Sequence, residues 1–248
     1  MKVIRNEEVA SKVFVLTIRD KRIASLASPG QFVNIRVRDS YFPLLRRPFS
    51  IHYVDADNFK IIYKVIGEGT KILSNYKQGE ELDIIGPLGN HFTYARYKNF
   101  LLIAGGMGVA TLYFLATSLS QKGLITTLIG AKTKAEILCE PGFAKFGKVM
   151  ITTEDGSYGT KGVVTDLLCR DPPWRVPTPE IIFACGPLEM LRVVKSYAQS
   201  HFIPCQLCLE QHMVCGIGVC LGCAVPSKNG YKYVCKDGPV FWAEEIEI

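Results

Sequence analysis

The sequence has 248 residues, of which 48% are hydrophobic and 21% are charged. This composition is ordinary for a globular protein and excludes a disordered, collagen-like or coiled-coil chain, while the length predicts one to two domains. Lysine and arginine number 29 against 23 aspartate and glutamate, which gives a net charge of +6. The basic residues are scattered and form no run typical of a nucleic-acid-binding arm, so we expect no nucleic-acid partner.

Residues 1–97 contain short β-like segments separated by turn residues. Segment 34–38 alternates polar and apolar positions, 59–66 is rich in β-branched and aromatic residues, and 81–85 ends at a Gly-Pro turn. Several strands at this spacing favour a small antiparallel β-barrel.

Residues 98–204 instead alternate short apolar strands with helical stretches. The expected segments are 100–104, 111–120, 124–130, 149–153, 165–169 and 181–184. This alternation predicts a parallel, doubly wound α/β domain. The uncharged stretch 100–121 is long enough to span a bilayer, but its glycines divide it into a strand, a turn and a helix, so we expect no membrane partner. The proline-rich stretch 171–179 is expected to be a surface connection.

The nine cysteines are the unusual feature of the sequence, because six of them lie close together, from Cys205 to Cys235. The first ten residues are charged and lack the apolar segment of a signal peptide, so we expect a cytoplasmic chain with reduced thiols. Cysteines crowded into one end of such a chain indicate ligands of a metal or cluster. Residues 205–248 are too few for an independent core, so the bound group is expected to stabilise them as a third module.

The spacing within this module is C-x4-C-x2-C followed by a distant cysteine, supplied by Cys215, Cys220, Cys223 and Cys235. It is the plant-type pattern for a 2Fe-2S cluster. The glycines at 216, 218 and 222 lack a Cβ and would let backbone N–H groups approach the negatively charged sulfurs.

A structural zinc is the competing interpretation. Cys205, Cys208, Cys220 and Cys223 also form a paired C-x-x-C arrangement. Its spacing is slightly shorter than the usual zinc pattern, and it leaves Cys215 and Cys235 without a role.

Two further motifs in the first domain suit a flavin nucleotide. In Arg47-Pro48-Phe49-Ser50 an arginine can pair a phosphate, a phenylalanine can lie against a flat ring, and a serine can hydrogen-bond a ring nitrogen. A Gly-Glu-Gly-Thr segment, ending in Gly69 and Thr70, precedes an expected helix at 71–76 and forms either an anion site or a plain capped turn.

The second domain has two strand–turn–helix junctions that suit a dinucleotide. One contains Gly105, Gly106 and Gly108, and the other contains Cys185, Gly186 and Pro187. The first is not a clean G-x-G-x-x-G, and no acidic residue ends the next strand, which disfavours a standard Rossmann dehydrogenase. The four histidines show no metal-ligand spacing, and hydrolase and phosphotransfer motifs are absent from the sequence.

The order R-P-F-S, G-E-G-T, G-P-L-G-N, G-G-M-G-V-A, C-G-P-L-E-M and the four-cysteine loop resembles the ferredoxin-reductase-like flavoproteins. The segments 209–223 and 234–241 are more closely similar to the electron-transfer subunits of type B dihydroorotate dehydrogenases. The resemblance implies an FAD-binding barrel at 1–97, an NAD-binding α/β domain at 98–204 and a 2Fe-2S module at 205–248. The implied FAD contacts are Arg47, Pro48, Phe49, Ser50, Ile62, Tyr63, Lys64, Gly69 and Thr70. The implied cluster ligands are Cys215, Cys220, Cys223 and Cys235.

The resemblance also implies a function and a partner. A separate FMN-containing catalytic subunit would oxidise dihydroorotate, and electrons would pass through the 2Fe-2S cluster and FAD to NAD+ in pyrimidine (UMP) biosynthesis. A flavin is required between the cluster and NAD+, because a cluster changes by one electron and nicotinamide takes a hydride. The implied assembly is a two-plus-two heterotetramer in the cytoplasm, and no side chain of this chain is expected to act as an acid or base on the pyrimidine.

Two alternatives remain open at this point. One is a reductase subunit of a related NAD(P)H–ferredoxin, hydrogenase or sulfur-metabolism complex, and the other is a zinc-stabilised binding module. The chain departs from the family's usual residues at His91, Thr111 and Cys208, where a glycine, a proline and a serine are common. Lys132 and Lys134 are either plain surface lysines or contacts for the 2′-phosphate of NADP, so the sequence leaves the choice between NAD and NADP open.

Overall fold

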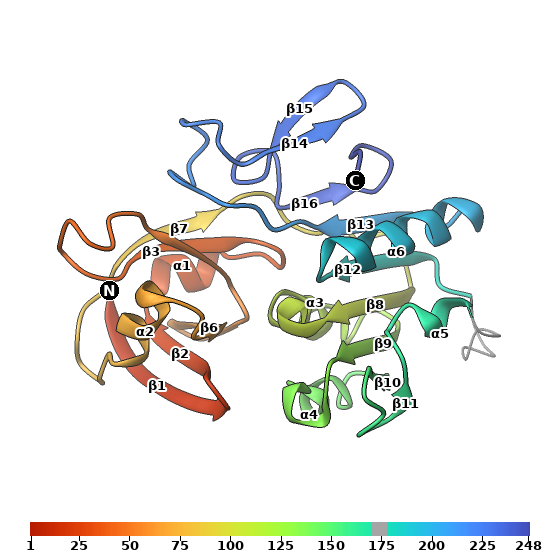
Figure 1. Ribbon diagram of the computed structural model, residues 1–248, viewed down its shortest axis with the longest axis horizontal. Helices are drawn as coiled ribbons and strands as arrows, with labels where there is room; N and C mark the ends of the chain where they lie inside the picture. Colours follow the sequence, from red (N-terminus) through yellow and green to blue (C-terminus); the bar gives the residue numbers. More distant parts are fainter. Residues whose placement is uncertain (170–177) are drawn as a thin grey trace.

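The computed structural model describes residues 1–169 and 178–248 (Figure 1); most of the proline-rich stretch 171–179 lies outside them. The amino-terminal part consists of two antiparallel sheets with a helix at either side. The first sheet, in spatial order, is β1 (Lys2–Ala10), β2 (Val13–Arg19), β6 (Asn58–Lys64) and β5 (Tyr53–Asp55). The second is β4 (Arg47–Ser50), β3 (Phe32–Arg36) and β7 (Asp83–Leu88). The helices are α1 (Lys21–Leu26) and α2 (Glu68–Ser74), so α2 begins three residues before the expected helix.

On each strand of the barrel, alternate side chains point inward and form its core. Val33 and Ile35 of β3 pack with Leu16, Ile18 and Ile61 in a core that is almost fully buried. Because side chains alternate along a strand, the other face of β3 presents Phe32 and Asn34 away from this core. That second face is also buried, by the segments that form the site described below.

The α/β part is one large sheet flanked by helices (Figure 1). Among the described residues its strands follow the order β11 (Thr160–Lys161), β10 (Lys148–Thr153), β9 (Leu124–Ala131), β8 (Asn99–Gly105), β12 (Ile181–Cys185), β13 (Cys205–Cys208) and β16 (Val240–Trp242). All neighbouring pairs are parallel except β13 with β16. The helices are α3 (Val109–Leu119), α4 (Glu140–Phe143), α5 (Asp166–Cys169) and α6 (Leu188–Ser200), with 3-10 turns η1 (Gly106–Gly108) and η2 (Lys134–Glu136).

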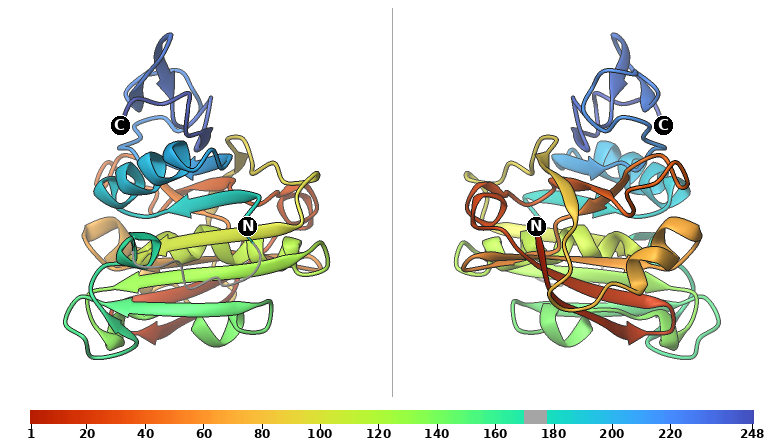
Figure 2. Two further views of the ribbon diagram at one scale, coloured as in Figure 1. Left: turned by 90° about the vertical axis from the view of Figure 1, so that its right-hand side faces the viewer. Right: turned by 90° about the vertical axis from the view of Figure 1, so that its left-hand side faces the viewer.

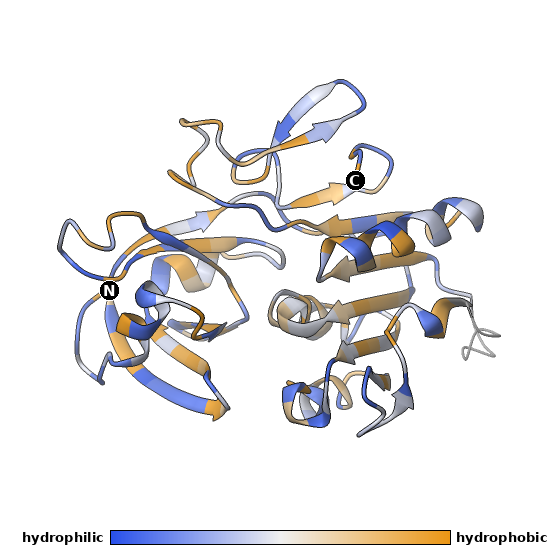
Figure 3. Cartoon of the chain, in the orientation of Figure 1, coloured by the Kyte–Doolittle hydropathy of each residue, from blue (hydrophilic) through white to orange (hydrophobic). Residues whose placement is uncertain are grey.

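The uncharged stretch 100–121 is a strand, a turn and a helix, as predicted. It comprises most of β8, then η1 and α3. Figure 3 shows apolar residues along the central strands, which is expected where helices cover both faces of a parallel sheet. Within the described ranges, we find no helix with the length and apolarity needed to cross a membrane.

The carboxy-terminal residues stand on top of the molecule (Figure 2). They form a hairpin of β14 (Ala224–Ser227) and β15 (Gly230–Tyr233), but β13 and β16 belong to the large sheet. Cys205–Cys208, the first residues of the expected third module, pair in register with β12 as a strand of the large sheet. Val225, Val234 and Ile246 share a core cluster with Leu191 and Val194 of α6, so the module uses the core of the α/β part.

His52 lies between the barrel and α3. Its Nδ1 is 2.9 Å from the carbonyl oxygen of Ala110, and its ring stacks on Tyr113 at 4.7 Å between centroids. Burial lowers its pKa from 6.5 to about 4, with the nearby Lys60 acting in the same direction and the Ala110 hydrogen bond opposing it. The histidine is therefore neutral in the folded chain at pH 7.

We expect this histidine to make folding acid-sensitive. Its stabilising contribution is complete above pH 6.5 and is lost as the pH falls toward 4, because protons bind the unfolded chain first. The shift is worth about 2 kcal/mol between pH 7.5 and pH 5. Urea-unfolding midpoints should fall less steeply with pH in His52→Phe than in the wild type. Parallel curves for His52→Phe and the wild type would contradict the assignment.

Candidate functional site

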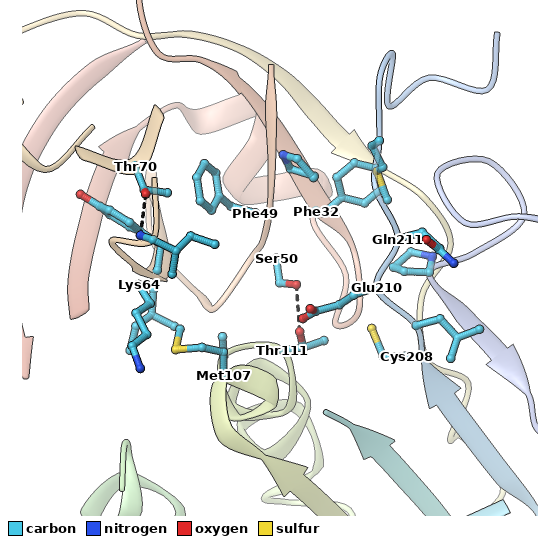
Figure 4. A pocket seen from close by; sticks show the side chains of 18 residues that line it. Phe32, Phe49, Ser50, Lys64, Thr70, Met107, Thr111, Cys208, Glu210 and Gln211 are labelled. Atoms are coloured by element: carbon cyan, nitrogen blue, oxygen red, sulfur yellow. Dashed lines mark hydrogen bonds between the residues drawn. The ribbon is translucent and has the colours of Figure 1, made fainter. Parts of the chain in front are cut away.

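A cavity of about 320 Å³ lies where the barrel meets the first turn of α3 and the segment after β13 (Figure 4). Of the nine expected FAD contacts, seven line it: Pro48, Phe49, Ser50, Ile62, Tyr63, Lys64 and Thr70. The rings of Phe49 and Tyr63 lie 5.6 Å apart and give the wall an aromatic surface. The cavity thus has the apolar, aromatic wall and the few polar groups that are typical of a cofactor site.

The other two expected contacts, Arg47 and Gly69, lie beside the cavity and touch each other. A Cβ at Gly69 would come within 2.5 Å of Arg47 Nε, so the glycine makes room for the guanidinium. The Thr70 hydroxyl accepts hydrogen bonds from the amides of Ile66 and Gly67 at 2.9 and 3.2 Å. Thr70 therefore caps α2, which is the plainer of the two interpretations of this turn, while its side chain also reaches the cavity wall.

Sequence reasoning missed the part of the cavity that comes from the end of β13. Cys208, Glu210 and Met213 line it together with Phe32 and Thr111. Glu210 also lines a second cavity, and burial by surrounding protein raises the pKa of its carboxyl group. Recognising 205–208 as a strand of the parallel sheet would have revealed these residues, because ligands bind at the carboxyl ends of such strands.

The expected dinucleotide residues meet at the carboxyl ends of β8 and β12. Gly105, Gly106 and Pro187 line two adjacent cavities of about 260 and 540 Å³, and Gly108 and Gly186 line the smaller one. Cys185, in contrast, is buried beneath the turn. Lys132 lines the larger cavity with Glu136 and Glu154, whereas Lys134 stacks over the Tyr158 ring outside it.

The four expected cluster cysteines lie on one loop system as two pairs. Cys223 Sγ and Cys235 Sγ are 3.3 Å apart, and the thiol of Cys215 is hydrogen-bonded with the side chain of Cys220. Two sulfurs per iron is the arrangement that a 2Fe-2S cluster requires. Within the described ranges, no three Cys, His, Asp or Glu side chains gather as ligands of a single metal ion.

Backbone amides are aimed at these sulfurs. Cys215 Sγ accepts from the N–H groups of Ile217 and Cys220 at 3.5 and 3.4 Å, and Cys235 Sγ accepts from that of Gly218 at 3.1 Å. Burial opposes ionisation of Cys215, but these amides and that of Val219 together bring its pKa down to about 6. The loop therefore fits a group that carries negative charge on its sulfurs.

The loop needs two of its three glycines for its backbone path. Gly216 and Gly218 have φ of +70° and +83°, a region that side chains rarely adopt. At Gly222 the backbone is ordinary, and a Cβ there would lie 3.6 Å from Cys220 Sγ.

The alternative zinc set is not assembled. Cys205 and Cys208 are three positions apart on β13, so their side chains point to opposite faces of the sheet. Accordingly, Cys205 packs in the core beneath α6, while Cys208 packs in the core beside α3. These two thiols are therefore unable to share one metal with Cys220 and Cys223.

Comparisons with known proteins agree with this geometry. A family model described as the iron-sulfur cluster binding domain of dihydroorotate dehydrogenase B matches residues 210–247, starting just after β13. The chain is 40% identical to the dihydroorotate dehydrogenase B (NAD(+)) electron transfer subunit of Geobacillus sp. (strain WCH70), covering 100% of this chain and 98% of that protein. The corresponding subunit of Caldanaerobacter subterraneus subsp. tengcongensis is 39% identical, over 99% and 96%.

The chain belongs to the family of dihydroorotate dehydrogenase B electron-transfer subunits. Among solved structures, that of an NADH-dependent reduced ferredoxin-NADP oxidoreductase is similar, with a TM-score of 0.89 and 34% identity over 99% of this chain and 89% of that one. The cytochrome b5 reductase domain of Ulva prolifera nitrate reductase shares the fold at a TM-score of 0.65 and 18% identity. The fold is thus that of the ferredoxin reductases, as predicted.

Two asparagines attach the cluster loops to the barrel. Asn34 Nδ2 donates to the carbonyl oxygen of Cys215 at 3.0 Å, and no described group donates to its buried Oδ1. Asn90 Nδ2 donates to the carbonyls of Asp237 and Val240 at 2.9 and 2.7 Å. Gly216 is required here as well, since a Cβ would come within 2.3 Å of Asn34 Nδ2.

We expect Asn34→Ala to loosen the cluster without unfolding the barrel. The substitution leaves the Cys215 carbonyl without its buried donor, which costs about 1–3 kcal/mol. Loss of the cluster's visible absorbance in the presence of a chelator should be about tenfold faster than in the wild type. Asn75→Ala, on the exposed end of α2, is the matched control. Equal rates for Asn34→Ala and the wild type would show that the hydrogen bond does not hold the loop.

Proposed function

We propose that this chain conducts electrons from a dihydroorotate-oxidising catalytic subunit to NAD+, using a 2Fe-2S cluster and FAD. The observation that supports this most strongly is the continuity of the two sites. Met213 lines the flavin cavity, and Cys215, two residues later, is the first cysteine of the cluster loop. On β3, Phe32 lines the same cavity and Asn34 bonds the Cys215 carbonyl.

When bound, the cluster supplies one-electron chemistry and the flavin converts it to hydride transfer. The residues of this chain bind and orient these groups. Phe49 and Tyr63 provide the apolar wall for the flavin ring, and Ser50 offers a hydroxyl to it. Cys215 and Cys220 would hold one iron, and Cys223 and Cys235 the other, with the amides of Ile217 and Gly218 neutralising charge on the sulfurs.

The nucleotide is proposed to bind at the glycine-lined cavities beside the flavin cavity. Met107 lines both the flavin cavity and the smaller of these cavities, so the two are neighbours. The proposed contacts are Gly105, Gly106, Gly108, Gly186 and Pro187, with Cys185 supporting the turn from below. This placement would put the bound nucleotide next to the flavin cavity, on the side where Met107 and Glu210 line both cavities.

The partner follows from the family, whose members are named as subunits of dihydroorotate dehydrogenase B. We infer that it is an FMN-containing catalytic subunit and that two copies of each chain assemble in the cytoplasm. The eight cysteines whose side chains the structure describes are free thiols, which agrees with a reducing compartment. We assign no side chain of this chain as a general acid or base in the reaction of the pyrimidine.

One observation favours a second candidate function. The chain is 34% identical to a chain of an NADH-dependent reduced ferredoxin-NADP oxidoreductase, so reduced ferredoxin is the second candidate electron donor in place of the FMN subunit. The two candidates share the cofactors and differ in the donor.

Affinity purification of the native complex distinguishes them. We expect the tagged chain to retain a flavoprotein partner, and the complex to reduce NAD+ when dihydroorotate is added. Reduction of NAD+ by a reduced ferredoxin, with none from dihydroorotate, would support the second candidate instead. If the purified chain alone oxidised dihydroorotate, the proposed division of labour would be wrong.

A further inference from the structure

Thr111 lies at a position that the proposed function leaves without a role. It is in the first turn of α3, only 2% exposed, and its Oγ1 donates a hydrogen bond of 2.9 Å to Ser50 Oγ on β4 (Figure 4). Both side chains line the flavin cavity. The α/β part thus contacts, through one hydroxyl, the serine that the barrel offers to the flavin.

A second group, the Cys208 thiol, competes with Ser50 for the Thr111 hydroxyl proton. The side chains of Cys208 and Thr111 are hydrogen-bonded, and Cys208 is also bonded with the side chain of Cys185, its register partner on β12. Thr111 has a single hydroxyl proton, and the oxygen of Ser50 accepts it better than the sulfur of Cys208 does.

The protonation of Cys208 is consistent with this direction. The hydrogen bond with Cys185 and burial both raise the pKa of Cys208, so the group stays a neutral thiol, a weaker acceptor than the Ser50 oxygen. With Ser50 Oγ accepting from Thr111, the proton of Ser50 is the one left for the cavity.

We propose that Thr111 is a positioning residue that orients the Ser50 hydroxyl proton into the flavin cavity. The proposal rests on the proposed function only in taking the cavity as the flavin site. It explains why a hydroxyl stands at position 111, since a proline or an apolar residue there offers Ser50 no donor.

The test uses the complete complex and measures flavin reduction by NADH in a stopped-flow instrument. Thr111→Val keeps the shape and removes the hydroxyl, so the rate should fall by about five- to tenfold, the amount expected for one neutral hydrogen bond. FAD content and the KM for NAD+ should stay unchanged, and the flavin absorbance band should shift. Thr111→Ser should restore both the rate and the spectrum. If the Thr111→Val protein does not fold, Thr111→Ala removes the same hydroxyl and can be compared with the wild type instead.

A double-mutant cycle separates positioning from a merely structural role. In a Ser50→Ala background the second substitution, Thr111→Val, should change the rate no further, because Thr111 acts through Ser50. An unchanged rate in the single variant, or additive losses in the double variant, would overturn the inference. Absence of NADH-dependent flavin reduction in the wild type would instead overturn the proposed function.

Discussion

Cys220→Ser should abolish dihydroorotate-dependent NAD+ reduction while leaving FAD bound. Cys220 is the exposed member of its pair, so the substitution removes one ligand of the proposed cluster without opening a core cavity. None of the four cysteines lines the flavin cavity. We expect more than a hundredfold loss of activity with dihydroorotate and near-normal activity when NADH reduces ferricyanide through the flavin.

Cys139→Ser is the matched control for this substitution. Cys139 precedes α4 in the α/β part, and burial raises its pKa to about 11, so it is an inert thiol far from the cluster loop in the sequence. Its replacement should leave both activities intact. Full dihydroorotate-dependent activity in Cys220→Ser would remove the cluster from the electron path.

Gly108→Ala should be the most damaging single-methyl substitution at the nucleotide site. A Cβ at this position would lie 1.9 Å from the carbonyl oxygen of Cys185, and backbone atoms cannot rotate away as a side chain can. The turn before α3 would have to separate from β12. We expect a loss of about 4 kcal/mol, which lowers the melting temperature by about 10 °C and weakens NADH binding.

Gly106→Ala, in the same turn, is the internal comparison. Its φ is +53°, but a Cβ there would meet nothing within 4 Å, so the cost is backbone strain alone, about 1 kcal/mol. Thermal unfolding and NADH titration of the two variants should therefore differ clearly. Equal stability of Gly108→Ala and Gly106→Ala would show that the close approach to Cys185 is not maintained.

The sequence predicted those features that depend on local pattern. The period-two alternation around residues 34–38 and the apolar strand before Gly105 each corresponds to an element of the structure. The cysteine spacing indicated a two-iron site, and the structure brings those four thiols together as two pairs. In each case neighbouring residues alone determine the geometry.

Features that depend on distant pairing were missed. Cys205–Cys208 is too short to show strand periodicity, and only its register with β12 and β16 makes it part of the large sheet. Glu210 therefore escaped notice, as did the hydrogen bond between Thr111 and Ser50, which joins residues sixty-one positions apart. The attachment of the cluster loop by Asn34 spans an even longer separation of 181 positions.

The most direct test of the electron path is the order in which its cofactors become reduced. The complete complex is mixed with dihydroorotate in the absence of NAD+, frozen at intervals and examined by electron paramagnetic resonance. The account predicts that the signal of a reduced 2Fe-2S cluster appears as rapidly as the wild-type complex turns over, and that it is absent in Cys220→Ser. Formation of NADH at the full rate, once NAD+ is added, from a complex whose cluster never becomes reduced would contradict it.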